Sequence, residues 1–390
     1  MRTLLIALLM AALLPARAAG TQEDAAALKS LEALYALDYA SSLEHIRSHI
    51  VERPDDPAGY LFEAGISWWW ETAEPGTLKS RPGFTSRFKR DIKTGLELSK
   101  ARFKSESAEE RADAYFTAGL LLGIRAQWNL SRRRWLKAYL DGRKGKKFQK
   151  RCLEIDPEYY DAYLGIGLHN YLAGTLPGIL KIGMSLLIRG DAEKGKEQLL
   201  LATEKGRYRF AATQAASNLV SLYILYEKDH PRALEVLRGL LKEFPDSPYF
   251  RFLEILSLDG MGDWDASHER ALALYGLASQ DPEILRGKRF STFCGVAASQ
   301  CLKPRTLRPV VVWLNRALEK EEKGPEGWRT ILRLYRGAAR DALGDREKAV
   351  ADYRTVLSLP DVADSHAFAG RCMKKRCRKR ALLRILRNPL

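Results

Sequence analysis

The feature that most constrains the fold of this chain is a pair of apolar positions that recurs every 38 or 39 residues, at 195, 233, 271, 310 and 349. In each pair the first residue is compact, and the residue four positions later is bulkier. The pairs are Gly195/Leu199, Ala233/Leu237, Ala271/Tyr275, Val310/Leu314 and Ala349/Tyr353. Residues four apart share one face of a helix, so a compact residue beside a bulky one lets two helices pack closely. A fixed period of this length predicts a stack of helical hairpins.

Prolines and glycines mark where these helices are expected to end. Three of the pairs are followed by a proline, at Pro245, Pro282 and Pro360. Proline ends a helix because it has no N–H to donate. Three Gly-Asp steps, Gly190-Asp191, Gly262-Asp263 and Gly344-Asp345, predict tight turns in which glycine takes the left-handed conformation and aspartate caps the next helix. No segment alternates as a strand would, so we expect an all-α protein.

The first half of the chain carries helices in a less regular order. Apolar spacing predicts two helices within 22–53 and further helices over 59–71, 84–104, 109–140, 148–155 and 161–172. Residues 132–150 are very basic, and they form either a solvated connection or an extension of a helix. We therefore expect an irregular helical region over 19–190, regular repeats over 191–365 and a basic tail over 366–390.

The first 18 residues have the pattern of a secretory signal. Arg2 gives a positive start, Thr3–Leu14 is an apolar run too short to span a bilayer, and Ala16-Arg17-Ala18 is a small-x-small cleavage sequence. We expect cleavage after Ala18 and export to the periplasm or cell envelope. The alternative is an N-terminal helix that is retained in the cytosol.

The chain is strongly basic, with a formal net charge of +16. Such a charge indicates an anionic partner, and for an exported protein this is a lipid surface or an envelope polymer. Nucleic acid would become the partner only if the chain stayed inside the cell. The residues expected to bind an anionic surface are Arg132, Arg133, Arg134, Lys144, Lys146, Lys147, Lys374, Lys375, Arg376, Arg378, Lys379 and Arg380. A merely solubilising role is the alternative.

The later repeats resemble the tetratricopeptide repeat. The resemblance is carried by Gly344–Tyr353 and by Arg232–Leu237 followed by Phe244-Pro245. Two features depart from that family: the period exceeds the usual one of about 34 residues, and the Trp/Leu/Gly/Tyr signature of the first helix is blurred. The resemblance implies a right-handed solenoid of antiparallel helix pairs that binds a protein partner, as a peptide or helix, in its concave groove without catalysis.

The segment Asp161–Tyr171, with Leu176-Pro177-Gly178 after it, is also similar to a segment of uncharacterised bacterial envelope proteins of this type. That similarity extends from about residue 24 to residue 360 and implies no known activity.

Two groups of residues are candidates for contact with a ligand or partner. Trp68, Trp69 and Trp70 occupy consecutive helix positions, so they cannot all face one core. Tyr163, His169, Asn170 and Tyr171 lie in the irregular helix before a Gly/Pro-rich segment, and Gly165-x-Gly167 there lacks the third glycine of a dinucleotide loop. Packing and capping roles are the alternative for both groups.

Metal, redox and catalytic signatures are weak. His45 and His49 have a spacing that suits zinc, but Glu44 precedes both histidines, unlike the metalloprotease order. The five cysteines, at 152, 294, 301, 372 and 377, contain no C-x-x-C. Local pairs 294/301 and 372/377 are possible by spacing, and buried or idle thiols are favoured. We predict no metal, no cofactor and no enzymatic activity.

The sequence thus predicts an exported helical-repeat scaffold or adaptor that holds a protein partner near the cell envelope. A binder of glycans or small molecules that uses the Trp68–Trp70 and Tyr163–Tyr171 residues is the alternative. A nucleic-acid-binding protein is a further alternative if the chain is not exported.

Overall fold

The computed structural model describes residues 25–73, 82–175, 190–280, 307–320, 326–362 and 364–378. These residues form helices and short turns, and no strand occurs among them, which confirms the all-α prediction for this part of the chain. The α-helices are α1 (Ala25–Tyr35), α2 (Tyr39–Glu52), α3 (Pro57–Ala73), α5 (Phe84–Ala101), α6 (Ala108–Ser131), α7 (Trp135–Ile155), α8 (Ala162–Thr175), α10 (Ala192–Lys205), α11 (Arg209–Leu222), α12 (His230–Glu243), α13 (Pro248–Met261), α14 (Trp264–Gln280), α16 (Leu307–Lys320), α17 (Glu326–Leu343), α18 (Arg346–Ser358) and α19 (Ser365–Lys374). None of these described helices is both long enough and apolar enough to cross a membrane.

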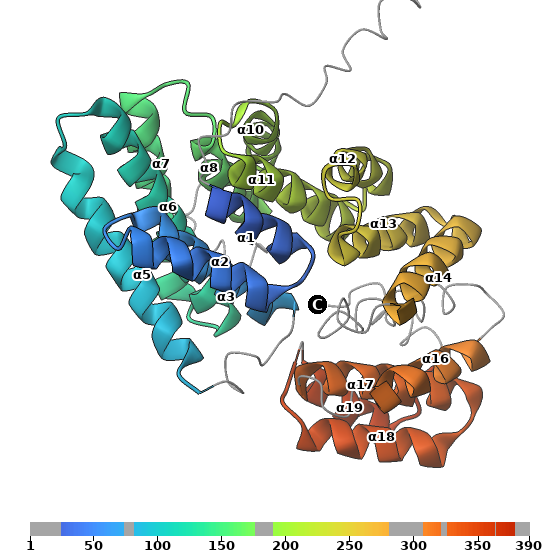
Figure 1. Cartoon of the computed structure of the whole chain (residues 1–390). Coiled ribbons are helices and arrows are strands. Elements are labelled where there is room, and N and C mark those ends of the chain that lie inside the picture. Colours follow the sequence, from blue (N-terminus) through green and yellow to red (C-terminus); the bar gives the residue numbers. More distant parts are fainter. Residues whose placement is uncertain are drawn as a thin grey trace, which may run out of the picture.

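The helices pack as successive pairs. α6 packs on α7, α8 on α10, α11 on α12, α13 on α14 and α17 on α18. The first four of these pairs pack on one another in chain order, and α17/α18 pack on α16 and α19. Figure 1 shows the resulting curve, which runs from α5 through α8 to α14, with α1 inside the curve and α16–α19 as a C-terminal group. This arrangement confirms the predicted solenoid of helix pairs. The hand of the superhelix stays a prediction.

The recurring apolar pairs form the contacts between helices. Gly195 is buried, and the described side chains of the pairs are fully buried: Leu199, Ala233, Leu237, Ala271, Val310, Leu314, Ala349 and Tyr353. At Gly195 a Cβ atom would lie 2.6 Å from the backbone N of Tyr171 and 2.7 Å from the carbonyl O of Gly167. Glycine is therefore required there, because α8 and α10 approach almost backbone to backbone.

The predicted turns follow the expected chemistry at most positions. Gly262 and Gly344 have φ values of 80° and 103°, in the left-handed region. Asp191 and Asp263 accept hydrogen bonds from the backbone N–H three residues later, at 3.1 and 3.2 Å. Asp345 lies at the N-cap of α18 but makes no side-chain capping bond.

The basic segment after α6 differs from the expectation of one helix over 109–140. α6 ends at Ser131, residues 132–134 make a tight turn, and α7 runs unbroken to Ile155. The helix can continue through the basic residues because Lys and Arg are good helix formers. Gly145 lets α7 lie close to α6, since a Cβ atom there would be 2.9 Å from the carbonyl O of Gly119.

The N-terminal helix closes the curve of the array. Tyr35 at the end of α1 is 1% exposed and packs on Phe250 and Phe244, with ring centroids 4.9 and 5.0 Å apart. The Ser247 hydroxyl donates a 2.7 Å hydrogen bond to the carbonyl O of Tyr35. Arg209 also pairs with Glu32 at 3.1 Å. We call this set the closing contact, because it joins the first helix to α11–α13.

The C-terminal helices are held by a buried carboxylate. Asp341 accepts hydrogen bonds from Arg346 at 2.8 Å, from Tyr353 at 3.2 Å and from the backbone N–H of Cys377 at 2.8 Å. A disulfide joins Cys372 to Cys377. The preference for idle thiols is therefore wrong for these two cysteines.

The remaining cysteines divide between described and undescribed parts of the chain. Cys152 is a buried free thiol, and burial raises its pKa, which makes it unreactive. Cys294 and Cys301 lie outside the described residues.

Replacing Leu237 with alanine tests the role of the recurring pairs. Leu237 is fully buried in the cluster that also holds Tyr35, so its truncation leaves a cavity. We expect Leu237→Ala to lower the free energy of unfolding by ~2–5 kcal/mol in urea titrations followed by circular dichroism. The control is Leu200→Ala on α10, where the side chain is exposed, and it should change stability by no more than ~0.5 kcal/mol. Equal losses in the two variants would contradict the assignment.

Candidate ligand-binding cavity

The array surrounds a partly open cavity of about 610 Å³. Its wall is built by α1, α3, α6, α7, α8, α11 and α13, and Ile331 and Tyr335 of α17 complete it. Apart from α7, these are the first helices of their pairs. The cavity is thus the concave groove of the solenoid, narrowed because α1 lies across it and contacts α13.

The cavity wall is largely apolar. Leucine and aromatic side chains dominate it, among them Leu31, Leu61, Phe62, Leu120, Leu164, Leu168, Leu172, Tyr249, Phe252 and Leu256. Glycines make part of the wall flat. At Gly123 on α6, an added Cβ atom would meet no atom within 4 Å, so that position faces open space.

The few polar groups of the wall are mostly bonded to one another. Trp68 Nε1 donates to Gln127 Oε1 at 2.7 Å, and Trp69 Nε1 donates to Gln214 Oε1 at 2.8 Å. Gln214 in turn donates to Asn218 at 3.1 Å. These bonds fix both indole rings at the wall, because a half-buried Trp N–H needs an acceptor.

Lys146 and His169 lie near each other on the described wall. Burial, with a contribution from Lys146, lowers the pKa of His169 to about 4, so its imidazole is neutral at pH 7. Burial also lowers the pKa of Lys146, and Lys150 and Lys194 add to this effect. Lys146 donates a hydrogen bond to Asn170, which leaves its ammonium half-buried at the edge of the wall.

The structure brings three of the predicted ligand residues to this cavity: Trp68, Trp69 and His169. Trp70 lies on the other side of α3, where it is buried and stacks on Tyr39 at a ring distance of 5.1 Å. The three tryptophans therefore divide between the cavity and the core, as three consecutive helix positions must.

The other residues predicted on α8 face away from the cavity. Tyr163 packs beside Tyr160, with ring centroids 6.4 Å apart. Asn170 is buried and donates to Gln198 at 2.7 Å. Tyr171 is fully buried, and its hydroxyl donates to Glu227 at 2.8 Å. These three side chains hold α8 against its neighbours, and none of them lines the cavity.

Several wall residues could not be predicted from the sequence. Gln127, Gln214 and Asn218 carry no motif, because their role depends on helices that lie far apart in the sequence. Gly119 and Gly123 are four residues apart, and this spacing indicates the flat face that α6 turns to the cavity.

The predicted basic residues have mixed surroundings. The guanidinium of Arg132 lies 3.1 Å from the ring centroid of Trp128, and Arg133 pairs with Asp364 at 2.6 Å. Arg376 donates to the carbonyl O of Asp341 at 2.8 Å. The side chains of Arg134, Lys144, Lys147, Lys374, Lys375 and Arg378 are exposed. Lys379 and Arg380 lie outside the described residues.

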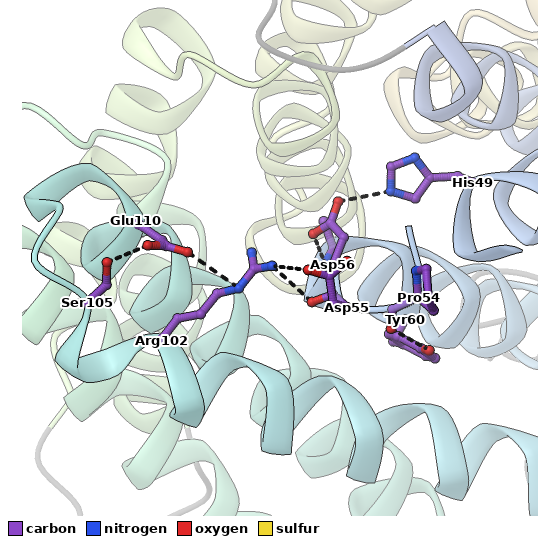
Figure 2. Close-up of polar contacts among 9 residues, drawn as sticks. His49, Pro54, Asp55, Asp56, Tyr60, Arg102, Ser105 and Glu110 are labelled. Carbon is purple, nitrogen blue, oxygen red and sulfur yellow. Dashed lines mark hydrogen bonds and ion pairs between the residues drawn. The ribbon is translucent and has the colours of Figure 1, made fainter. Parts of the chain in front are cut away.

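Of the two histidines considered for zinc, His49 contacts a carboxylate in the turn after α2. His49 Nε2 lies 2.9 Å from Asp56 Oδ2, and Tyr60 donates to the carbonyl O of Pro54 at 2.9 Å (Figure 2). Arg102 donates to the carbonyl O of Asp55 at 3.0 Å and thereby ties the turn after α2 to the end of α5 (Figure 2). Within the described part of the chain, no group of three or more His, Cys, Asp or Glu side chains is arranged to hold a metal ion.

The fold defines the class of the protein. Its buried small/large pairs, paired helices and glycine turns make the chain a tetratricopeptide-like helical-repeat protein.

Comparison with known proteins gives structural matches only. The crystal structure of yeast Tom70 is 12% identical, covers 93% of this chain and 90% of its own, and has a TM-score of 0.40. The TPR domain of P58(IPK) is 13% identical, covers 92% of this chain and 97% of its own, and has a TM-score of 0.24. No family model matches the chain, and no curated protein sequence does.

Proposed function

We propose that the protein is a non-enzymatic helical-repeat binding protein whose ligand is a slender hydrocarbon chain held in the cavity. The observation that carries this proposal is the apolar cavity of about 610 Å³, built by helices from both ends of the described chain. This volume lies within the range of small-molecule sites, about 300–1,000 Å³. The wall offers leucine and aromatic contacts along its length and only a few polar groups, which suits an acyl chain better than a glycan.

The hydroxyls and charged groups of the wall support a binding role. The Ser221 and Thr72 hydroxyls donate to backbone carbonyls of their own helices, at 3.0 and 2.9 Å. No carboxylate is present among the described wall residues, so His169 has no acid beside it to orient it as a base. The ammonium of Lys146 is placed to neutralise an acidic end of the ligand.

Filling the cavity tests this function. Gly123→Leu places a side chain in open space and replaces a helical glycine, so the protein should fold at least as well as the wild type. We expect a fluorescent fatty acid to bind the wild type, with energy transfer from Trp68 and Trp69. The affinity of Gly123→Leu for the fatty acid should be at least about tenfold weaker. The added side chain fills space that more than one methylene of the fatty acid would otherwise occupy, so less of the ligand is buried.

A matched control is available on α12. A Cβ atom at Gly239 would also meet no atom within 4 Å, and Gly239 does not line the cavity. Gly239→Leu should bind the probe as the wild type does. Equal binding by the wild type and both variants would place the probe elsewhere and overturn the proposal.

A second candidate function is an adaptor that binds a protein partner, as the tetratricopeptide resemblance implies. The observation that favours it is that the cavity belongs to the concave side of the array, the surface on which such arrays bind peptides. A photo-crosslinking amino acid at Trp135, on the edge of the cavity, should then capture a protein in the native cell. Capture should be lost with Gly123→Leu and should not occur from Leu200 on the outer surface.

We further propose that the chain is exported to the periplasm or cell envelope. The apolar run Thr3–Leu14 and the small-x-small sequence at 16–18 support this proposal. The disulfide between Cys372 and Cys377 also supports it, since disulfides persist in oxidising compartments.

The intact mass of the protein produced with its native N-terminus tests export. We expect a mass that begins at Ala19 and recovery outside the cytoplasm. Leu8→Arg is the control, because a charge within the apolar run should leave the chain uncleaved in the cytoplasm. An uncleaved, cytosolic wild type would contradict export and would favour binding of nucleic acid.

A further inference from the structure

One face of α7 is exposed and combines apolar with basic side chains. Leu136 and Leu140 are 66% and 52% exposed, and together with the adjacent Trp135, which is 53% exposed, they form a contiguous apolar patch of the kind that marks an interaction site. The same face continues at helical spacing with four exposed basic residues: Arg143, Lys144, Lys147 and Lys150. We call these six residues the α7 face.

Most of the positive charge of this region is not neutralised within the described structure, although Arg133 pairs with Asp364 and Arg151 with Glu154. Residues 132–151 contain ten Lys or Arg and a single acid, Asp141. Asp141 is already bound by Arg125 at 2.6 Å and by Asn129 at 3.0 Å, on the side of α7 that packs on α6. Arg143, Lys147 and Lys150 form no ion pair with any described residue. The α7 face therefore attracts an external anion.

The α7 face lies beside an opening of the cavity. Leu130 and Trp135 both line the cavity, and they are 42% and 53% exposed. Trp135 directly precedes Leu136 in α7, so the apolar wall continues onto the apolar end of the α7 face.

We propose that the α7 face docks on an anionic membrane, with Leu136, Leu140 and Trp135 entering the headgroup region and the basic side chains contacting lipid phosphates. Amphipathic surfaces of this composition bind membranes by combining apolar burial with attraction to anionic lipids. The docking stands independently of the proposed ligand. If that function holds, the same geometry presents the opening of the cavity to the bilayer, from which an acyl chain would be taken.

The two leucines favour a membrane over a nucleic acid. Phosphate contacts with DNA or RNA use basic and polar side chains, and they would leave Leu136 and Leu140 in water. A bilayer surface instead removes these side chains from water at the depth where the basic groups meet phosphates.

Co-sedimentation with vesicles tests the docking. Vesicles of phosphatidylcholine with added phosphatidylglycerol should bind the full chain, and vesicles of phosphatidylcholine alone should bind it at least about tenfold more weakly. The variant Leu136→Ser/Leu140→Ser should lose about tenfold in affinity at every salt concentration. The variant Arg143→Ser/Lys147→Ser/Lys150→Ser should lose a similar factor, mostly at low salt.

Matched controls remove the same groups elsewhere. Lys89→Ser/Lys93→Ser/Lys100→Ser takes three exposed charges from α5, and Leu200→Ser/Leu272→Ser takes two exposed leucines from α10 and α14. Both controls should bind vesicles as the wild type does. Equal losses in the controls, or no preference for anionic vesicles, would overturn the docking proposal. Salt-dependent RNA binding that the leucine variant leaves unchanged would overturn it as well.

The two proposals fail separately. Gly123→Leu should bind vesicles normally even though it does not bind the fatty-acid probe. Loss of probe binding with intact docking concerns only the cavity, and loss of docking with intact probe binding concerns only the α7 face.

Discussion

The burial of Tyr35 among Phe244, Phe250 and Trp69 is the contact on which the site depends. An array of helix pairs defined only by neighbour contacts has an open concave groove. Here α1 crosses the groove and is held by stacked aromatic rings and by the bond from Ser247 to its last carbonyl. The closing contact converts the groove into a partly open, apolar cavity. The cavity is therefore a property of the whole array and belongs to no single repeat.

The cavity does not collapse, because hydrogen bonds and close helix contacts hold its wall in place. The indoles of Trp68 and Trp69 are fixed by Gln127 of α6 and Gln214 of α11. Close approach at Gly119 and Gly145 fixes the spacing of α6 and α7, and close approach at Gly195 fixes that of α8 and α10. Apolar groups thus face one another across a gap that packing alone would close.

Features that depend on local spacing in the sequence could be predicted. The small/large pairs predicted the buried positions at Ala233 and Leu237, and the unusual run at 68–70 pointed to two residues of the cavity wall. The course of α7 was missed, since basic residues suit both a loop and an exposed helix. The closing contact could not be predicted either, because nothing in the sequence around Tyr35 indicates that Phe244 and Phe250 are its partners, more than 200 residues later.

The sequence distance spanned by the closing contact has a consequence for how the molecule assembles. Contacts between neighbouring helices form quickly because the loops they close are short, whereas a contact between residues 35 and 250 must wait for the intervening chain. Until α1 docks, the rings of Phe244 and Phe250 lack the contact with Tyr35 that covers them. In a chain made from its N-terminus, α1 emerges first yet can dock only after α13 has been made, so the interval between its synthesis and its docking is when a chaperone would be most useful.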